Sequence, residues 1–180
     1  MTKEQQRVKE WMRKFGQECP DKPTQINEKT AILRAKLILE EALETILKGL
    51  GIEVIVRRDA SSVHISESNF KDEVEFEFIK AKEVNLVEVA DGISDIMVVA
   101  EGTAVACGID SEPVHQEVLR SNDSKLYTSE EIVALPTGFS CERVSDSEKG
   151  FLVKNEDGKV QKSPSYFPAN ILSILEKQER

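Results

Sequence analysis

The spacing of apolar residues predicts two long helices. In residues 30–50 the apolar positions recur every three or four residues and are expected to form one core stripe, which consists of Ile32, Ala35, Leu39, Leu43, Ile46 and Leu50. Residues 83–107 are apolar on almost every side and are followed by Gly108, a residue that commonly ends a helix. Asn27 or Thr30 is the expected N-cap of the first helix. We expect the two helices to pack antiparallel.

Three shorter helices are expected around this pair. Residues 3–15 predict an amphipathic helix whose apolar face consists of Val8, Trp11, Met12 and Phe15. Residues 112–121 predict a helix that lies beside the two long ones. A last short helix begins near Pro168, because proline is common in the first turn of a helix.

Residues 52–79 have a period of two and predict a small β ribbon inserted between the long helices. Its clearest alternation is that of Val74, Phe76 and Phe78 with Glu75 and Glu77. A helix over residues 71–82 is the alternative interpretation. Residues 151–162 predict a second hairpin, whose turn is Asp157-Gly158.

Together these elements predict a mainly α fold, a helical bundle with a small β ribbon. We interpret residues 1–180 as a single domain. Within it we expect the β insertion at about 52–79 and a C-terminal hairpin plus short helix at about 151–178.

The charge of the chain restricts its partners. With 24 basic and 33 acidic residues the net charge is −9, which argues against nucleic acid and anionic membranes as partners. A polyanionic small molecule is compatible with this charge only if cations bridge the two. No apolar run reaches the length of a membrane span, and the N-terminus lacks the apolar core of a signal peptide. The three cysteines have no CxxC spacing, so we expect reduced thiols in a cytoplasmic protein.

Carboxylates interrupt the second long helix at positions where burial would be costly. Glu88, Asp91 and Asp95 fall on one stripe, within about 60° of each other on a 3.6-residue period. No Lys or Arg stands between Lys82 and Arg120 to neutralise them. Because like charges so placed raise each other's pKa or require a cation, we expect a divalent metal to bind here.

The first long helix carries a matching acidic set, Glu40, Glu41 and Glu44. Glu41 and Glu44 have the same i, i+3 spacing as Glu88 and Asp91, so four carboxylates from two neighbouring helices are expected to converge. Oxygen-rich clusters of this kind suit Mg²⁺ or Mn²⁺. The alternative is a solvated helix face, with Lys36 paired to Glu40 and Lys48 to Glu44.

The segments "LILEEALE" and "EVADGISDIMVVAEGTAVACGID" resemble the all-α nucleoside triphosphate pyrophosphohydrolases, specifically their MazG-like and phosphoribosyl-ATP pyrophosphohydrolase-like branch. The shared pattern, ExxE followed by ExxD, is matched by Glu41, Glu44, Glu88 and Asp91. The resemblance continues in "RSNDSKL" and "DGKVQKSPSYFP" and implies a MazG-like helical bundle. The interval between the two motifs is longer than in compact relatives, because the β-patterned insertion fills it.

This resemblance implies hydrolysis of a nucleoside triphosphate to a nucleoside monophosphate and pyrophosphate. Glu41, Glu44, Glu88 and Asp91 are then expected to hold two or three Mg²⁺ ions, which lower the pKa of a bound water and polarise the α-phosphoryl group. Asp95 is expected to be a further ligand or to support one. Glu40 or Glu41 is the expected residue that orients or deprotonates the attacking water.

Basic and aromatic residues are the candidates for holding the substrate. Lys125 is the first candidate for the phosphates, followed by Arg120 and Arg34. Asn122 either pairs with a sugar or base edge or caps a helix. Trp11 and Tyr166 either contact the nucleotide or pack in the core.

The sequence indicates a nucleoside triphosphate as the substrate, but no residue in it identifies the nucleobase unambiguously. We expect a (deoxy)nucleoside triphosphate, with a purine such as dGTP favoured over dUTP or dCTP, and an enzyme that shapes a nucleotide pool. The alternative is a non-catalytic helical protein that binds a metal for structure or regulation. Because the helix at 83–107 needs cover on every side, we expect a homo-oligomer, a tetramer in preference to a dimer.

Overall fold

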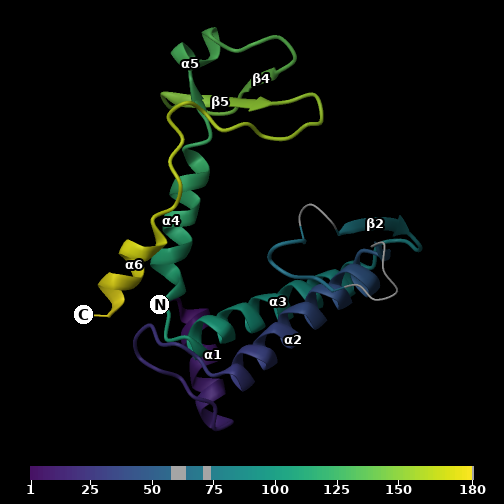
Figure 1. The fold of residues 1–180 in the computed structure, drawn as a ribbon, viewed down its shortest axis with the longest axis vertical. Helices are drawn as coiled ribbons and strands as arrows, with labels where there is room; N and C mark the ends of the chain where they lie inside the picture. The colour runs from purple at the N-terminus through teal and green to yellow at the C-terminus, as the bar shows by residue number, and fades with distance from the viewer. Residues whose placement is uncertain (58–63, 71–73, 180) are drawn as a thin grey trace. The chain divides into compact units, whose positions relative to one another are not determined.

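The computed structural model describes residues 1–57, 64–70 and 74–179 (Figure 1). Their fold is mainly α with two small sheets, as the apolar pattern predicts. The chain divides into two compact units. The helical unit consists of Glu4–Pro20 and Thr24–Cys107, and the C-terminal unit consists of Gly108–Arg180 with Met1–Lys3 and Asp21–Pro23. The interpretation of the chain as one domain stays a prediction.

The helical unit contains α1 (Lys3–Lys14, apart from its first residue), α2 (Glu28–Glu44), a π-helical turn η1 (Thr45–Gly49) and α3 (Leu86–Ala106). Asparagine side chains begin both long helices. The Asn27 carboxamide accepts a hydrogen bond from the Thr30 backbone N–H (2.9 Å), and the Asn85 carboxamide accepts one from the Val87 backbone N–H (3.1 Å). Each satisfies an N–H group that the helix itself leaves free.

The helices α2 and α3 are antiparallel neighbours, as predicted. Their contacts run in opposite order along the two segments: Gly49 lies against Val89, Thr45 against Gly92 and Arg34 against Gly102. The approach at Gly92 is the closest, because a Cβ atom added there would lie 2.2 Å from Thr45 Oγ1. Only a residue without a side chain permits this distance between the two backbones.

The core of the helical unit lies at the C-terminal end of α3. Its buried residues are Met12, Val105 and Ala106, and the residues packed against them are Val8, Cys19 and Ile26. The predicted apolar stripe of α2 is not part of this core, and its interpretation as a core stripe was wrong for a single chain. Ile32 is 48 % exposed and Leu39 is 61 % exposed. The residues that lie against Val89, Gly92 and Gly102 of α3 are Gly49 and Thr45 of η1 and Arg34 of α2, and none of the three belongs to the stripe.

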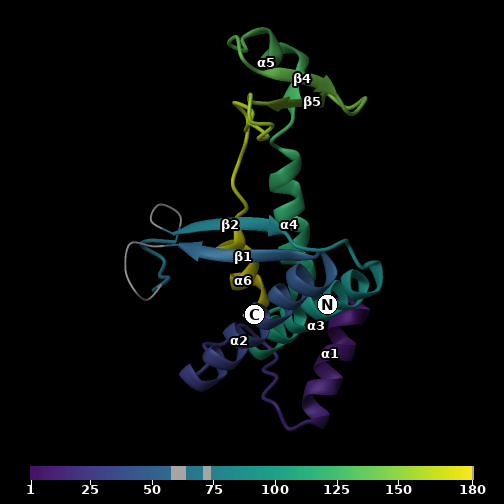
Figure 2. The ribbon, with the colours of Figure 1, turned by 90° about the vertical axis from the view of Figure 1, so that its right-hand side faces the viewer.

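The segment between the long helices forms the predicted ribbon. Strands β1 (Ile52–Arg57) and β2 (Glu75–Lys80) are antiparallel, and Ile52 pairs with Lys80 at one end of the register (Figure 2). The alternative of a helix over residues 71–82 is wrong, because the alternating residues of β2 bond along their backbone to β1. Residues 58–63 and 71–73 of the predicted insertion lie outside the described residues.

The C-terminal unit contains the helices α4 (Ser111–Asp123), α5 (Ser129–Val133) and α6 (Ile171–Gln178), and the strands β3 (Tyr127–Thr128), β4 (Ser140–Arg143) and β5 (Lys149–Lys154). The strands form an antiparallel sheet in the order β3-β5-β4. The Gln178 side chain ties the end of α6 to the start of α4, because it accepts from the Asp110 backbone N–H (2.8 Å) and donates to the Asp110 carbonyl (3.0 Å).

The hairpin predicted at 151–162 is only partly right. Its turn exists, with Gly158 at a positive φ of 77°, but its second arm contributes a single bridge, between Lys154 and Val160. The main partners of β5 are β4 and β3. The four residues of β4 are all exposed and do not alternate in polarity, so no apolar pattern predicts that strand.

No single helix among the described residues has the length and apolar character of a membrane span; only α3 and α4 taken together pass by length and composition.

Candidate active site

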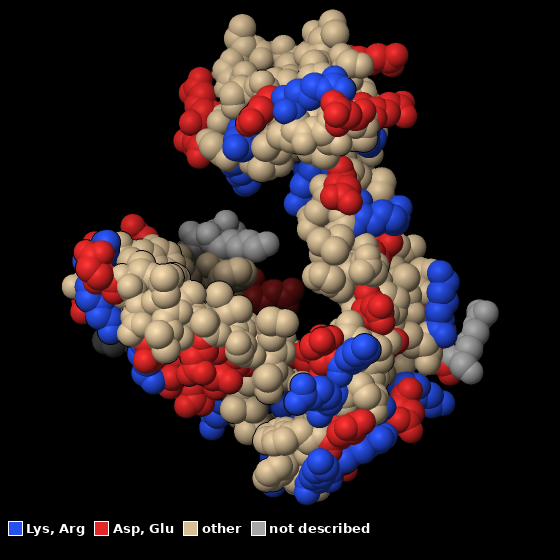
Figure 3. Space-filling view, turned by 180° about the vertical axis from the view of Figure 1, so that it is seen from behind, with Lys and Arg blue, Asp and Glu red and all other residues tan. Residues whose placement is uncertain are grey.

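The close contact between α2 and α3 brings the two acidic sets to one place. Thr45 packs on Gly92; Glu41 stands one turn before Thr45, and Glu44 directly precedes it. The Thr45 hydroxyl donates to the Glu41 carbonyl (2.8 Å), which fixes this side chain against α2. Acidic side chains gather in a patch on the part of the molecule that contains α2 and α3 (Figure 3).

The electrostatics of Glu41 show which carboxylates are neighbours. Its pKa is raised above the ordinary value of 4.5, first by burial and then by the negative charges of Asp95, Glu44, Glu40 and Asp91. Two of these four residues lie on α3, so carboxylates from both helices act on one another across the contact. This is the situation in which a bound cation lowers the free energy of the folded protein.

A lysine ammonium already lies at the other end of the acidic patch. Lys48 forms an ion pair with Glu44, and its pKa is raised first by that hydrogen bond, with further contributions from Glu88 and Glu41. The expected alternative, pairing within a solvated helix face, is therefore present for Lys48 and Glu44. The described ion pairs do not include one between Lys36 and Glu40.

The donor set has the chemistry that Mg²⁺ requires, because carboxylate oxygens are hard ligands and both helices supply them. Among the described residues, however, no three Asp, Glu, His or Cys side chains converge closely enough to form a complete metal site. The structure thus places candidate carboxylates on two neighbouring helices, without the convergence that a complete metal site requires.

Two residues that shape this site were missed by the sequence analysis. Thr45 and Gly92 set the distance between the helices. Lys48, which was expected to pair with Glu44, also faces Glu88. The signal for Gly92 was its place directly after Asp91, inside a helix whose other residues are mostly larger. A glycine in a helix interior costs stability unless a neighbour must come close.

Arg34 does not join the acidic patch. It is 7 % exposed, and its guanidinium donates to the Gln17 side-chain oxygen (2.6 Å) and to the Met12 sulfur (3.8 Å). Burial lowers the pKa of this arginine. The seven residues from Arg34 to Glu41 correspond to about 10 Å along a helix, which separates the guanidinium from the carboxylates.

The other expected phosphate-binding residues lie in the C-terminal unit. The Lys125 ammonium donates to the Asn122 side-chain oxygen (2.8 Å). Arg120 forms two hydrogen bonds to Glu117 (2.8 Å each), and its guanidinium lies 4.3 Å from the centre of the Phe167 ring. The hydrogen bonds from Arg120, with one from the Asn170 backbone, lower the pKa of Glu117 to about 2.

Buried serines join the two C-terminal segments that carry the family resemblance. The Ser121 hydroxyl donates to the Phe167 carbonyl (2.9 Å), and the Ser163 hydroxyl donates to the Ser124 carbonyl (2.8 Å). The Ser124 hydroxyl accepts from the Phe167 backbone N–H (3.2 Å). Tyr166, the other aromatic residue of this loop, lies under the Lys162 ammonium at 4.4 Å. The end of α4 and the loop before α6 are therefore one assembly.

Trp11 is not buried in the core. It is 50 % exposed, and its ring lies 4.6 Å from the ring of Phe15, which is 66 % exposed. Met12 is the only residue of the predicted apolar face of α1 that is fully buried among the described residues. Both aromatic rings are thus available to a ligand or a second chain.

Residues 8–122 match the phosphoribosyl-ATP pyrophosphohydrolase family. The match covers more than half of the chain, so the protein belongs to this family, which is of the MazG-like all-α type. The resemblance seen in the sequence is confirmed. The family supports a nucleotide pyrophosphohydrolase activity in general and is generally dependent on Mg²⁺. No individual protein of established function matches closely enough to be named as a relative.

The raised pKa of Glu41 predicts a pH-dependent effect of Glu41→Gln on the metal-free protein. Above the raised pKa the ionised carboxylate destabilises the fold, so the variant should be more stable than wild type at pH 7. As the pH falls through the raised pKa and below the ordinary value of 4.5, Glu41 becomes protonated in both states and this advantage should vanish. Urea unfolding in EDTA between pH 4 and pH 8 measures the difference. An advantage that stays constant over this range would contradict the assignment.

Proposed function

We propose that the protein is a metal-dependent (deoxy)nucleoside triphosphate pyrophosphohydrolase. Water attacks the α phosphorus, and the products are a nucleoside monophosphate and pyrophosphate. One observation carries the proposal: Glu41 feels the charges of Asp91 and Asp95 across the Thr45–Gly92 contact, in a chain of this family. A protein with net charge −9 needs cations at this place to accept a triphosphate.

Glu41, Glu44, Glu88 and Asp91 are the residues that would hold Mg²⁺, with Mn²⁺ as a substitute and two or three ions in each site. Asp95 would complete or support this set. Bound Mg²⁺ supplies a water of lowered pKa and polarises the phosphoryl oxygens. Lys48 would then have to share Glu44 with the metal.

Proton transfer falls to the carboxylates of α2. Glu41 is the first candidate for orienting or deprotonating the water, because it neighbours the carboxylates of both helices. Glu40, the next residue along the chain and exposed, is the second candidate for orienting the water. Either carboxylate would accept the proton of the attacking water.

The candidates for holding the substrate stay those that the sequence indicates. Lys125 and Arg120 would pair with the outer phosphates and Asn122 with the sugar or the base. Tyr166 and Trp11 would contact the nucleotide through their rings. The favoured substrate is a purine deoxynucleotide such as dGTP, followed by dUTP and dCTP.

Arg34 is the last of these candidates. A phosphate contact by Arg34 would require its guanidinium to leave the Gln17 side-chain oxygen and its buried position against Met12.

A second candidate function is a non-catalytic protein that binds a metal for structure or regulation. The observation in its favour is that no three metal-binding side chains of the described residues converge completely. A Mg²⁺-dependent release of pyrophosphate from any common nucleoside triphosphate would exclude it.

Replacement of Asp91 by Ala tests the proposed site. Turnover of a triphosphate should fall at least about a hundredfold, since even residues that only support a metal ligand have effects of tenfold to a hundredfold. The metal-free variant should stay folded and gain stability, because one of the crowded negative charges is removed. Pyrophosphate release measures the first effect and urea unfolding the second.

Glu83→Gln is the matched control, because Glu83 is an exposed acid that pairs with Lys80 just before α3. It should keep wild-type turnover. A fully active Asp91→Ala protein would mean that this carboxylate has no part in the reaction.

We further propose that copies of this chain associate through the exposed apolar stripe of α2, as a tetramer in preference to a dimer. Leu39 and Ile32 lie on that stripe with about half of their surface exposed, and α3 adds Ile93 (50 % exposed). Exposed apolar surface of this extent on two neighbouring helices is typical of an interface between subunits.

Sedimentation velocity at micromolar concentration tests the association. The wild-type protein should sediment well above the 20.2 kDa of one chain. Leu39→Glu should shift it toward the monomer, because a charge would be buried without a partner. Leu172→Glu on α6, at a residue 69 % exposed, should leave the mass unchanged. A wild-type protein that is monomeric would refute the proposal.

A further inference from the structure

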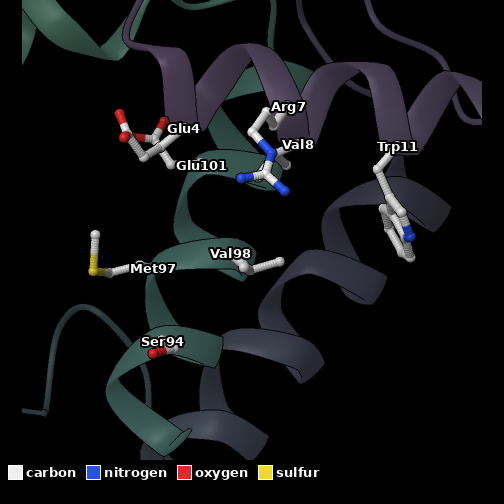
Figure 4. Close-up of a pocket in the computed structure, with 8 residues that line it drawn as sticks. All are labelled: Glu4, Arg7, Val8, Trp11, Ser94, Met97, Val98 and Glu101. Atoms are coloured by element: carbon white, nitrogen blue, oxygen red, sulfur yellow. The ribbon is translucent and has the colours of Figure 1, made fainter. Parts of the chain in front are cut away.

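A cavity of about 480 Å³ lies between α1 and α3, within the helical unit (Figure 4). Its walls are largely apolar and include three charged side chains; the lining residues are Val8, Trp11, Ser94, Met97, Val98, Glu4, Arg7 and Glu101. Cavities that are mostly apolar, with a few polar groups that fix orientation, are typical of small-molecule sites.

Two side chains of α1 give this cavity a chemical preference. Trp11 presents its indole ring, which is half exposed, from one side of the cavity. Arg7 lies one turn earlier and extends its guanidinium toward α3 (Figure 4). None of the described residues forms an ion pair or hydrogen bond with this guanidinium, so its donors are free for a ligand. An aromatic ring beside a free, planar set of donors suits a flat heterocycle with adjacent acceptors.

The cavity adjoins the acidic stripe of α3. Ser94 and Val98 line the cavity, and Asp95 stands between them in sequence on the neighbouring stripe. An α-helix rises about 1.5 Å per residue, so the centre of the cavity-lining residues of α3 lies only about 5–10 Å along the helix axis from the centre of its acidic residues. At this separation, the 5′ phosphates of a nucleotide whose base lies in the cavity are within reach of the carboxylates.

We propose that this cavity binds the nucleotide base and that Arg7 selects bases with a 6-oxopurine edge. The inference rests on the proposed function, in that the ligand is a nucleotide. Trp11 would stack on the ring, and the Arg7 guanidinium would donate to O6 and N7, the pairing that arginine makes with guanine. Adenine presents an amino group at position 6, where two donors would face each other, and pyrimidines have no N7. Glu4 and Glu101 also line the cavity.

Trp11 is the only tryptophan of the chain, so its fluorescence reports on this cavity alone. The full-length protein in EDTA is titrated with dGMP, dAMP, dCMP and dUMP, none of which is hydrolysed. A saturable change with dGMP is expected at a concentration at least tenfold below that needed for the other three. Arg7→Met should weaken the dGMP response about tenfold to a hundredfold, the range of one bidentate arginine–guanine pair. Arg13→Met, on the same helix and outside the cavity lining, should leave it unchanged.

Any of three results would overturn the assignment. The first is that 2-deoxyribose 5-phosphate, which has no base, gives the same response as dGMP. The second is that dGMP and dAMP bind with equal affinity, and the third is that Arg7→Met and Arg13→Met weaken dGMP binding equally. A change of Trp11 emission with protein concentration alone and no response to nucleotide would mean that a second copy covers the cavity. Circular dichroism confirms that each variant is folded.

The base site and the proposed reaction fail separately. Hydrolysis of triphosphates with Mg²⁺ that does not depend on Arg7 would remove the base site and leave the reaction. Selective dGMP binding in a protein that hydrolyses nothing would leave the base site and remove the reaction.

Discussion

The rest of the helical unit depends on how closely α2 and α3 approach at Thr45 and Gly92. A Cβ atom at residue 92 would lie 2.2 Å from the threonine hydroxyl, so the two backbones are nearer here than ordinary side chains allow. This approach has an electrostatic consequence, because Glu41 then feels the charges of Asp91 and Asp95. The contact that packs the helices therefore also collects negative charge that the fold cannot neutralise by itself. Lys48 neutralises part of this negative charge by pairing with Glu44, and we propose that divalent cations neutralise the remaining carboxylates.

The residues that match the family contain nearly all of the features proposed for the reaction. Residues 8–122 include the carboxylates of both helices, the Thr45–Gly92 contact and most of the cavity beside Trp11. The match ends close to the C-terminus of α4, and beyond it the buried serines bind the loop before α6 to that helix end. The chemistry of the proposed reaction thus belongs to the helical unit, and the C-terminal unit carries Lys125 and Tyr166 as additional candidates for substrate contact.

The parts of the fold that have strong local patterns could be predicted from the sequence. The two long helices and the ribbon were predicted because their apolar residues recur with periods close to 3.6 and 2. Strand β4 was missed because Ser140–Arg143 is short and has no apolar alternation, and it is a strand only through its pairing with β5. The apolar stripe of α2 was found, but its exposure was not, because periodicity identifies the apolar side of a helix and leaves open what covers it.

The candidate site was predictable to a similar degree. The spacing of Glu41, Glu44, Glu88 and Asp91 in the sequence was enough to identify the acidic pairs. Thr45 could not be found in this way, because a hydroxyl that bonds to the carbonyl of its own helix leaves no mark on the sequence. Arg34 was expected to bind phosphate because it is basic. Its burial against Met12 and Gln17 depends on tertiary packing, which the sequence does not show.

The position of bond cleavage tests the central claim, that the carboxylates of α2 and α3 direct water to the α phosphorus of a nucleoside triphosphate. The measurement is hydrolysis in ¹⁸O-labelled water with Mg²⁺, followed by mass spectrometry of both products. We predict that the label enters the nucleoside monophosphate and that pyrophosphate carries none. Label in pyrophosphate, or the release of single phosphate from the γ end, would contradict the claim.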